Sequence, residues 1–589
     1  MSANTDDLEL QMSPRTQNGQ RYEHTGEAEM DTSPQRRGIL HLTVDTPLSE
    51  TTQKTVLNRQ PPRWRTPEFY VYYLIFAIVI PAMVWKPISL SRETSANYPL
   101  YRSRLSNGWL FGRNFDNSDP QFRTFRNNLP LLLLIAGTFL GLKVIYLRLY
   151  RTSYTPVIET RLHHIPFSFI SSLLFLFGLH GVNFIKIIII MSISFGIAKS
   201  LKGSKLLPFI TWGFNMAVLF AIERNSGYKF ANLSSFLAFL DKYQGAYARW
   251  YIPFNFTMLR LVSFNMDYHW AYTMNNARNP QVDGEMSLKQ RTTTSHDLSV
   301  YSFTNFMTYV LYPPLFLAGP IMTYNDFMWQ HYRPSLVPSR KYVGRYLIRF
   351  ICCLLTMELI LHFMYVVAIK DSAAWQGDTP FELSMIGFWN LIIVWLKLLL
   401  PWRFFRLWAL ADGLYPPENM IRCMANNYST LGFWRAWHRS FNLWTVRYIY
   451  IPLGGTKNLL VSTALIFTFV ALWHDLTFRL LAWGWLVSLF IIPEVAAKYA
   501  VPSSKYGNRP WYRHICAVGA VGNVLMMLTA NLVGFVIGVD GMKYMISQIS
   551  GSWEGLQFLF LACACLFVGI QIMFEYREEE MRNGIFRRC

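Results

Sequence analysis

The feature that most constrains this chain is a series of apolar runs that are long enough to cross a lipid bilayer. A helix spans the hydrocarbon core with about 20 consecutive apolar residues, and about a dozen stretches approach that length. They lie near residues 69–85, 129–147, 165–179, 182–198, 206–222, 298–322, 346–369, 383–400, 459–473, 476–492, 515–539 and 556–574. Because 52% of the residues are hydrophobic and only 15% are charged, we predict an all-α polytopic membrane protein. We expect about 10–12 spans plus re-entrant elements.

Polar segments at both ends divide the chain into three parts. Residues 1–62 mix charges of both signs and contain few large apolar residues, which is typical of a disordered tail. Residues 63–574 form the predicted membrane domain, and residues 575–589 form a short charged tail, whose run Glu578–Glu580 is interpreted as a solvated face. The net charge of +20 fits basic residues beside anionic headgroups and gives no argument for nucleic-acid binding.

The seven cysteines are scattered along the chain. Most of them lie in or beside apolar runs, and none has metal-ligand spacing to a histidine. We therefore expect neither a disulfide framework nor a metal site.

The first polar constellation inside the membrane domain is FWRAWHRSFNLWTVRYIYIPLGG, residues 433–455. Wound as one helix at about 100° per residue, this segment gathers its large aromatic side chains into one stripe. The stripe consists of Trp434, Trp437, Phe441, Trp444 and Tyr448. Pro452 and the two glycines after it are predicted to end the helix.

His438 borders this stripe, and Arg435, Arg439 and Asn442 continue onto the adjoining face. A histidine that borders an apolar face when a solvent position was available favours a functional role. Arg435 and Arg439 are four residues apart and repel each other, so a bound phosphate or lipid headgroup is one interpretation. The other is an amphipathic helix at the membrane interface with its arginines in water.

The second constellation is ALWHDL, residues 471–476, which places His474 and Asp475 in an apolar stretch. Ionisable groups are costly at such a depth and usually face a cavity or a partner. Adjacent helical side chains diverge, so Asp475 is a poor partner for His474 and is expected to pair with Arg479 instead. His474 is then available to a substrate; the structural alternative is a bond to a backbone carbonyl of a neighbouring helix.

Two further segments carry polar or helix-breaking residues. YPPLFLAGPIMTYNDF, residues 312–327, cannot continue one helix through Pro313, Pro314 and Pro320. It is interpreted as a re-entrant element that lines a cavity, or as a loop at the membrane surface. In PWRFFRLWALADG, residues 401–413, Arg403 and Arg406 alternate with aromatic residues, which is typical of an interfacial anchor.

The segment FWRAWHRSFNLWTVRYIYIPLGG followed by ALWHDL resembles the signature of the membrane-bound O-acyltransferase (MBOAT) family. His438 and His474, 474 − 438 = 36 residues apart, match its two polar positions. YPPLFLAGPIMTYNDF resembles the branch that contains hedgehog acyltransferase and the fungal glycerol-uptake proteins. Similarity to the fungal branch continues in NGWLFGRNFDNSDPQFRTFRNN, FNFTMLRLVSFNMDY and WYRHICAVGAVGN, and covers most of the chain from about residue 64 onward.

The resemblance implies an MBOAT-like helical core in the endoplasmic-reticulum membrane. It implies transfer of a very long acyl chain from acyl-CoA to the sn-2 hydroxyl of a lyso-glycosylphosphatidylinositol (lyso-GPI) lipid, which remodels the GPI anchor. The expected partners are acyl-CoA, the lyso-GPI lipid or a GPI-anchored protein, and membrane lipids. Acyl-CoA is a co-substrate, and no cofactor is expected.

Acyl transfer to a hydroxyl requires a base, and a neutral imidazole suits that role. His474 is the expected base, and His438 is expected to orient the acceptor or to stabilise the oxyanion. The candidate substrate-binding residues are Arg435, Arg439, Asn442, Trp434 and Trp473, with the arginines directed to the CoA phosphates. Two alternatives stay open: a polyol–proton symporter, for which paired broken helices are expected, and a protein acyltransferase.

Overall fold

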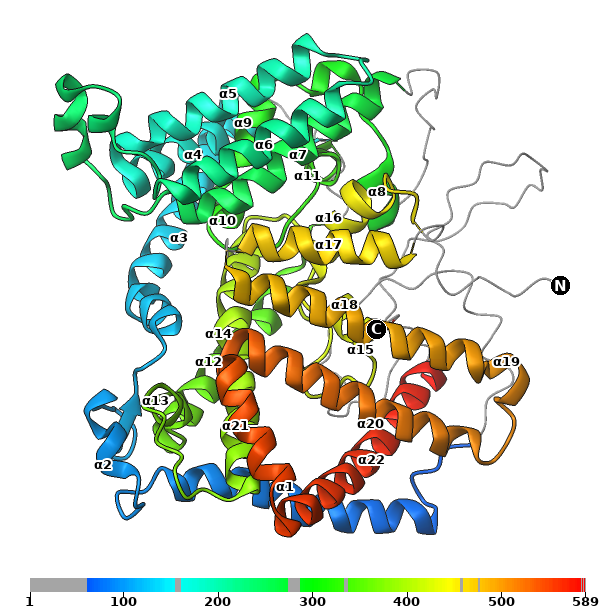
Figure 1. Ribbon diagram of the computed structural model, residues 1–589. Helices are drawn as coiled ribbons and strands as arrows, with labels where there is room; N and C mark the ends of the chain where they lie inside the picture. Colours follow the sequence, from blue (N-terminus) through cyan, green and yellow to red (C-terminus); the bar gives the residue numbers. More distant parts are fainter. Residues whose placement is uncertain are drawn as a thin grey trace.

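The computed structural model describes residues 61–153, 160–273, 286–332, 337–455, 459–474, 477–583, 585 and 587. The described chain is built almost entirely from helices (Figure 1). One short antiparallel ribbon joins β1 (Leu105–Asn107) to β2 (Asn114–Asp116). Of the predicted disordered tail, residues 1–60 lie outside the described residues.

Eight helical regions of the described chain are long and apolar enough to cross a membrane. They are α1 (Pro67–Leu90), α3 (Pro120–Ser153), α4 (His164–His180) with α5 (Phe184–Ser200), α12 (Arg340–Phe363), α14 (Pro380–Ala411), α18 (Phe478–Ala500) with α19 (Ser503–Tyr506), α20 (Tyr512–Asn531) with η11 (Leu532–Val536), and α22 (Trp553–Arg582). The prediction of an all-α polytopic membrane protein is therefore confirmed.

The remaining helical segments are shorter or less apolar. They are α2 (Tyr98–Tyr101), η3 (Arg102–Arg104), η4 (Gly181–Asn183), α6 (Leu207–Arg224), η5 (Phe230–Asn232), η6 (Ser235–Lys242), α7 (Tyr251–Thr273), α8 (Leu288–Thr293), η7 (Leu298–Val300), α9 (Phe303–Leu311), α10 (Pro313–Phe316), α11 (Tyr324–Tyr332), α13 (Val366–Asp371), α15 (Thr430–Ala436), α16 (Arg439–Thr445), η9 (Val446–Tyr450), α17 (Leu459–His474) and α21 (Gly538–Ser550). The apolar run 298–322 is thus divided among several short helices, which is one reason why fewer than the expected 10–12 spans meet the length criterion.

The helices form two groups around a central helix. In Figure 1, α4 to α7 make up the upper group, and α17, α18, α20, α22 and α1 follow one another through the lower group, each packed on the next. Helix α14 packs against α1 and α22 of the lower group and contacts α4 of the upper group through Trp408, whose ring lies 6.3 Å from that of Phe175. Of its most apolar window 61% is buried, the largest share of the eight spans. In α1 that share is only 6%, so α14 is the scaffold and α1 lies at the periphery.

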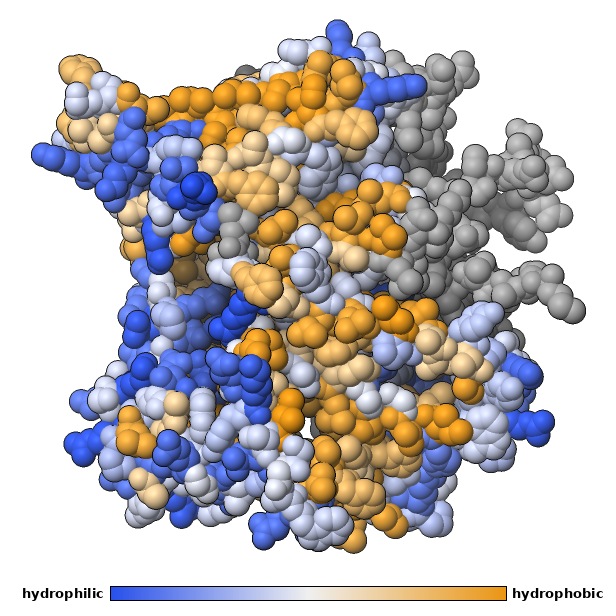
Figure 2. All heavy atoms as spheres, in the orientation of Figure 1, coloured by the Kyte–Doolittle hydropathy of each residue, from blue (hydrophilic) through white to orange (hydrophobic). Residues whose placement is uncertain are grey.

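The surface of the spans is itself apolar. Leu74 on α1, Leu174 on α4 and Ile348 on α12 are each more than 60% exposed, and apolar side chains extend over much of the face seen in Figure 2. In water such a surface would drive aggregation, whereas hydrocarbon covers it without loss. These faces are therefore lipid-facing.

The proline-rich segment after α9 shows why its backbone breaks where it does. Pro314 has no N–H for the carbonyl of Val310, four residues earlier. Arg260 of α7 replaces the missing donor: its Nη1 lies 3.0 Å from the Val310 oxygen, and its Nη2 donates to the Leu315 oxygen. The segment is buried against α7 rather than exposed at the surface, as expected for irregular backbone at membrane depth.

Replacing Arg260 with Leu should therefore destabilise the fold by about 2–3 kcal/mol, because the carbonyl of Val310 loses a charged donor inside the protein. Thermal unfolding of the detergent-solubilised protein measures the effect. Arg249→Leu, two residues before the start of the same helix and exposed, is the matched control and should change stability by less than about 0.5 kcal/mol. Equal stability of the two variants would contradict this account of the break.

Part of the charged tail predicted at residues 575–589 belongs to helix α22. Helix α22 continues to Arg582, and Glu575 and Glu580 are buried rather than solvated. Glu580 accepts two hydrogen bonds from the Arg422 guanidinium, at 2.7 and 3.1 Å, and one from Arg587 at 2.8 Å. Glu580 therefore belongs to an internal ion-pair cluster, because Arg422, distant in sequence, packs onto the helix, whereas Glu578 and Glu579 of the same run are partly exposed.

The interpretation of residues 401–413 as an interfacial anchor is also wrong. Arg403 and Arg406 lie in α14 and are buried. Arg406 pairs with Glu418 at 3.3 Å and donates to the carbonyl of Pro416 at 2.9 Å. The charge of Arg406 is thus balanced by the carboxylate of Glu418 inside the protein, and not by lipid headgroups as expected.

Candidate active site

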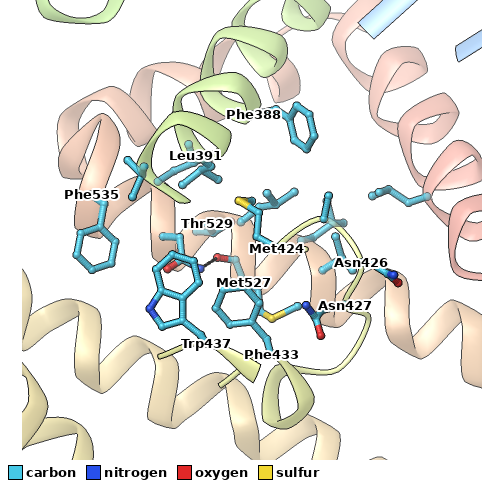
Figure 3. Close-up of a pocket in the computed structure, with 18 of the residues that line it drawn as sticks. Phe388, Leu391, Met424, Asn426, Asn427, Phe433, Trp437, Met527, Thr529 and Phe535 are labelled. Carbon is cyan, nitrogen blue, oxygen red and sulfur yellow. Dashed lines mark hydrogen bonds between the residues drawn. The ribbon is translucent and has the colours of Figure 1, made fainter. Parts of the chain in front are cut away.

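A large cavity with a volume of about 1500 Å³ lies beside the central helix α14. Helices α1, α7, α14, α17, α20, α21 and α22 contribute to its wall, together with the segment 424–445. The close-up in Figure 3 shows apolar side chains of this wall, among them Phe388, Leu391, Met527 and Phe535. Among the described residues that line the cavity, none is Asp, Glu, Lys or Arg.

Polar side chains are few in this lining. They are Gln121, Asn255, Ser384, Asn426, Asn427, His438, Asn442, Thr445, His474, Thr529, Asn531 and Ser550. Both histidines selected from the sequence and Asn442 are among them, and Trp434 and Trp473 also line the cavity. The fold thus brings five of the seven candidate site residues to one wall.

His474 is the last residue of α17, and its side chain is accessible from the cavity. A reciprocal pair of hydrogen bonds fixes this helix end. Asn255 of α7 donates from Nδ2 to the Trp473 oxygen at 2.9 Å, and the Trp473 indole donates to the Asn255 oxygen at 3.0 Å. The last carbonyls of a helix have no partner within it, so Asn255 both satisfies one of them and holds His474 at the wall.

His438 lies at a break in the backbone. Its φ of 42° and ψ of 50° are left-handed, and it separates α15 from α16. Asn419 stabilises the new helix start, because its carbonyl accepts from Arg439 N at 3.0 Å and its Oδ1 accepts from Ser440 N at 3.2 Å. His438 is 93% buried and lines the cavity, and no described residue hydrogen-bonds its Nε2.

Stacked rings connect the two histidines. The His438 ring stacks on Trp402, with centroids 4.6 Å apart, and on Phe441 at 5.3 Å. Phe441 stacks on Trp473 at 4.7 Å, and Trp473 contacts the His474 ring edge-on at 4.9 Å. Because each ring restricts its neighbour, the relative position of the two imidazoles is fixed by packing.

The prediction of one continuous helix from residue 433 is wrong. The left-handed residue at His438 turns the chain, so Arg435 in α15 and Arg439 in α16 are not neighbours on one helix face. Neither arginine lines the cavity. The predicted aromatic stripe is divided as well, because Trp444 and Tyr448 are buried in the core and do not line the cavity. The Trp444 indole donates to the carbonyl of Leu259, and the Tyr448 hydroxyl bonds to the hydroxyl of Ser263, both on α7.

The expected pair of Asp475 and Arg479 cannot be described, because Asp475 lies outside the described residues. The Arg479 guanidinium donates from Nε to the carbonyl of Val533 at 3.1 Å. The residues that sequence reasoning missed are Asn255 and Asn419. Each bonds to residues more than 18 positions away in the sequence, so no local sequence pattern identifies either one.

The model of the family described as MBOAT, membrane-bound O-acyltransferase family, matches residues 206–539. That region contains both histidines, Asn255 and Asn419.

Two relatives match over almost the full chain, and a third matches over a shorter part. The membrane-bound O-acyltransferase GUP1 of Candida tropicalis is 46% identical over 563 residues, which cover 93% of this chain and 94% of the relative. The protein of the same name from Saccharomyces cerevisiae is 46% identical over 543 residues, covering 90% and 94%. The mouse protein-cysteine N-palmitoyltransferase HHAT is 30% identical over 225 residues, 37% of this chain and 44% of the relative.

Proposed function

We propose that this chain, which belongs to the membrane-bound O-acyltransferase family, transfers a very long acyl chain from acyl-CoA to the sn-2 hydroxyl of a lyso-GPI lipid. It is a multi-pass membrane acyltransferase. We propose acyl-CoA as the donor, the lyso-GPI lipid as the acceptor and the endoplasmic-reticulum membrane as the location of the protein. One observation carries it: two histidines lie on the wall of a large cavity whose lining has no charged side chain among the described residues.

The size and chemistry of the cavity favour an acyl chain as its occupant. Its volume of about 1500 Å³ exceeds the range of about 300–1,000 Å³ that is usual for small-molecule pockets. Burial of each CH₂ group contributes about 0.8 kcal/mol, so a longer chain gains more from an apolar wall. The nucleotide of acyl-CoA and the head group of a GPI lipid would stay outside, because phosphates need cationic or N–H partners.

In the proposed reaction His474 acts as the general base. It takes the proton of the acceptor hydroxyl as the oxygen attacks the thioester carbon. The tetrahedral intermediate then collapses, the C–S bond breaks, the ester forms, and the proton returns to the sulfur that leaves as CoA. His438, with Nε2 unpartnered among the described residues, would donate to the developing oxyanion or orient the acceptor.

The apolar lining also protects the thioester. A cavity that admits little water suppresses hydrolysis of the donor and strengthens the hydrogen bonds that the imidazoles make. Asn442, Trp434 and Trp473, which line the same wall, would hold the acyl chain and its carbonyl beside the histidines. The reaction needs no further cofactor, and acyl-CoA is its co-substrate.

Arg435 and Arg439 lie beside the cavity rather than in it, which suits contact with the CoA phosphates. Arg435→Ala should then raise the KM for acyl-CoA about tenfold, equivalent to about 1.4 kcal/mol, with kcat nearly unchanged. Steady-state kinetics with varied acyl-CoA measure this. Lys543→Ala removes an exposed cation of α21 and serves as the control, and a KM that is equal in both variants would remove Arg435 from the donor site.

The proposal is tested by incubating the purified full-length protein with labelled acyl-CoA and lyso-GPI. The expected product is GPI lipid that carries the label in an ester. A series of donors of increasing length should show higher turnover for the longer chains, because most of the wall is apolar. Absence of labelled lipid, with the protein folded, would overturn the proposed acceptor.

A protein acceptor is the second candidate, because the mouse relative is named a protein-cysteine N-palmitoyltransferase. Label on a protein rather than on the lipid in the same assay would favour it. The cavity fits a polyol–proton symporter less well than an acyltransferase, because a polyol needs hydrogen-bond partners and the lining is mostly apolar. Concentrative glycerol uptake into proteoliposomes, without acyl transfer, is the result that would favour the symporter.

A further inference from the structure

Helix α14 contributes one continuous face to the wall of the large cavity. Its lining residues recur mostly every three or four positions, which is the spacing of side chains on one side of a helix. Between Phe381 and Trp402 they include Ser384, Phe388, Leu391, Val394 and Leu398. Phe388 and Leu391 of this face are labelled in Figure 3. Every described α14 residue that lines the cavity between Ser384 and Trp402 is apolar, so the helix offers a long apolar wall.

One end of this wall lies beside the histidines. Trp402 is the last α14 residue in the lining, and its ring stacks on His438, with centroids 4.6 Å apart. In the proposed reaction the thioester carbonyl lies at His438 and His474, so the acyl chain begins at this end of α14. All other α14 residues of the lining precede Trp402. Along this helix the chain can therefore extend in one direction only.

The opposite end of the wall is marked by two aromatic rings and an ion pair. Phe381, the second residue of α14, and Phe558 of α22 both line the cavity, and their ring centroids are 6.0 Å apart. Next to Phe381, Glu382 pairs with Lys86 of α1 at 3.2 Å. A chain that passed the two rings would bring hydrocarbon against this ion pair and remove water from it, which is costly. The apolar wall thus ends at Phe381.

The distance between the two ends is long for a lipid chain. Phe381 and Trp402 are 402 − 381 = 21 residues apart in one helix, which corresponds to about 32 Å at about 1.5 Å per residue. The hydrocarbon core of a bilayer consists of two layers of acyl chains and is about 30 Å thick. A chain that extends through one layer would therefore cover only about half of the α14 wall.

We propose that the cavity face of α14 sets the length of the acyl chain that the enzyme selects. The thioester carbonyl lies at the histidines beside Trp402, and the terminal methyl group lies against Phe381 and Phe558. A shorter chain leaves apolar wall uncovered, and a longer chain has to bend or to disturb the ion pair of Lys86 and Glu382. This inference rests on the proposed acyl-CoA donor and not on the identity of the acceptor.

The direct test uses saturated acyl-CoA donors of increasing length, each with a photoreactive diazirine at the methyl end. The purified full-length protein is illuminated with each donor, and the labelled residues are mapped by mass spectrometry. Label from short donors should lie near Leu391 and Val394, and label from longer donors should move toward Phe381 and Phe558. An excess of unlabelled acyl-CoA should abolish the labelling. Binding alone gives this readout, so no acyl acceptor is needed.

Two substitutions that narrow the cavity should shorten the accepted chain in a fixed order. Val394 and Ser384 are half-buried residues of the lining, about 12 Å and about 27 Å from Trp402 along the helix. Val394→Trp should impose the shorter limit and Ser384→Trp the longer one. Donors above each limit should label about tenfold less than in wild type, because overpacking is costly. Shorter donors should stay within about twofold.

Leu74→Trp is the matched control for these variants. Leu74 lies on α1, is 63% exposed and is not part of the lining, so the same substitution there should leave the length profile unchanged. A limit that shifts equally in Leu74→Trp would contradict the assignment. Should either variant of α14 fail to fold, the labelling of wild-type protein still decides.

Label that stays in one place for all donor lengths, or that avoids the α14 wall, would overturn the proposal. Movement of the label toward Phe381 without acyl transfer to lyso-GPI would support the length limit and overturn the proposed acceptor. Acyl transfer to lyso-GPI with a label that does not move would support the proposed function and overturn the length limit. Failure of the two proposals is therefore distinguishable.

Discussion

Replacement of His474 by Ala should lower acyl transfer by about 10²–10⁴-fold, the contribution usual for a positioned general base. The side chain is accessible from the cavity, so its removal leaves no core contact unfilled and the fold should persist. Turnover of labelled acyl-CoA onto lyso-GPI measures the effect. His474→Gln should be equally inactive, because an amide can donate a hydrogen bond but cannot take up the proton.

The matched control for this variant is His514→Ala. His514 lies on α20, away from the cavity lining, and bonds to Gln571 at 3.2 Å. Its loss should leave turnover within about twofold of wild type, equivalent to less than about 0.5 kcal/mol. Wild-type turnover in His474→Ala would remove the residue from the mechanism, while equal losses in both variants would point to a general effect on folding.

Replacement of Glu580 by Ala should lower the free energy of unfolding by about 3–5 kcal/mol, because it leaves buried arginines without their carboxylate. Glu580 is 2% exposed and bonds to Arg422 and Arg587. Thermal or denaturant-induced unfolding in detergent measures the loss. Arg422 lies between Asn419 and His438 in the chain, so a reduced kcat should accompany the lower stability.

Glu554→Ala is the control for Glu580→Ala on the same helix. Glu554 lies in the first turn of α22 and is exposed, so its removal costs only the interaction with the helix dipole, about 0.3–1 kcal/mol. A loss of similar size in Glu580→Ala would contradict the importance of the buried cluster. It would restore the interpretation of this run of glutamates as a solvated face.

The sequence was sufficient to select the two histidines, and the reason is physical. Each lies among apolar residues where an ionisable side chain is costly, so the signal is local. The same reasoning failed for Arg403 and Arg406. An arginine beside aromatic residues is compatible with a membrane interface and with a buried ion pair, and only the position of Glu418 decides between them.

The backbone at His438 illustrates the other limit. Helical periodicity predicts one continuous helix from residue 433, and each part of it is indeed helical. The break depends on Asn419, which offers a carbonyl and a side-chain oxygen to the first N–H groups of α16. A bond from a residue 19 positions earlier than His438 leaves no trace in the periodicity, and it decides which way the imidazole points.

The sequence by itself determined that this chain is a helical membrane protein with two histidines at costly positions, because hydrophobic length and burial cost are properties of short segments. Only the tertiary structure decided that both histidines line one uncharged cavity, that Arg435 and Arg439 lie outside it, and that Glu580 is buried. Those outcomes depend on contacts between residues far apart in the chain, such as Asn255 with Trp473. Such contacts are selected by the packing of whole helices, which no local pattern encodes.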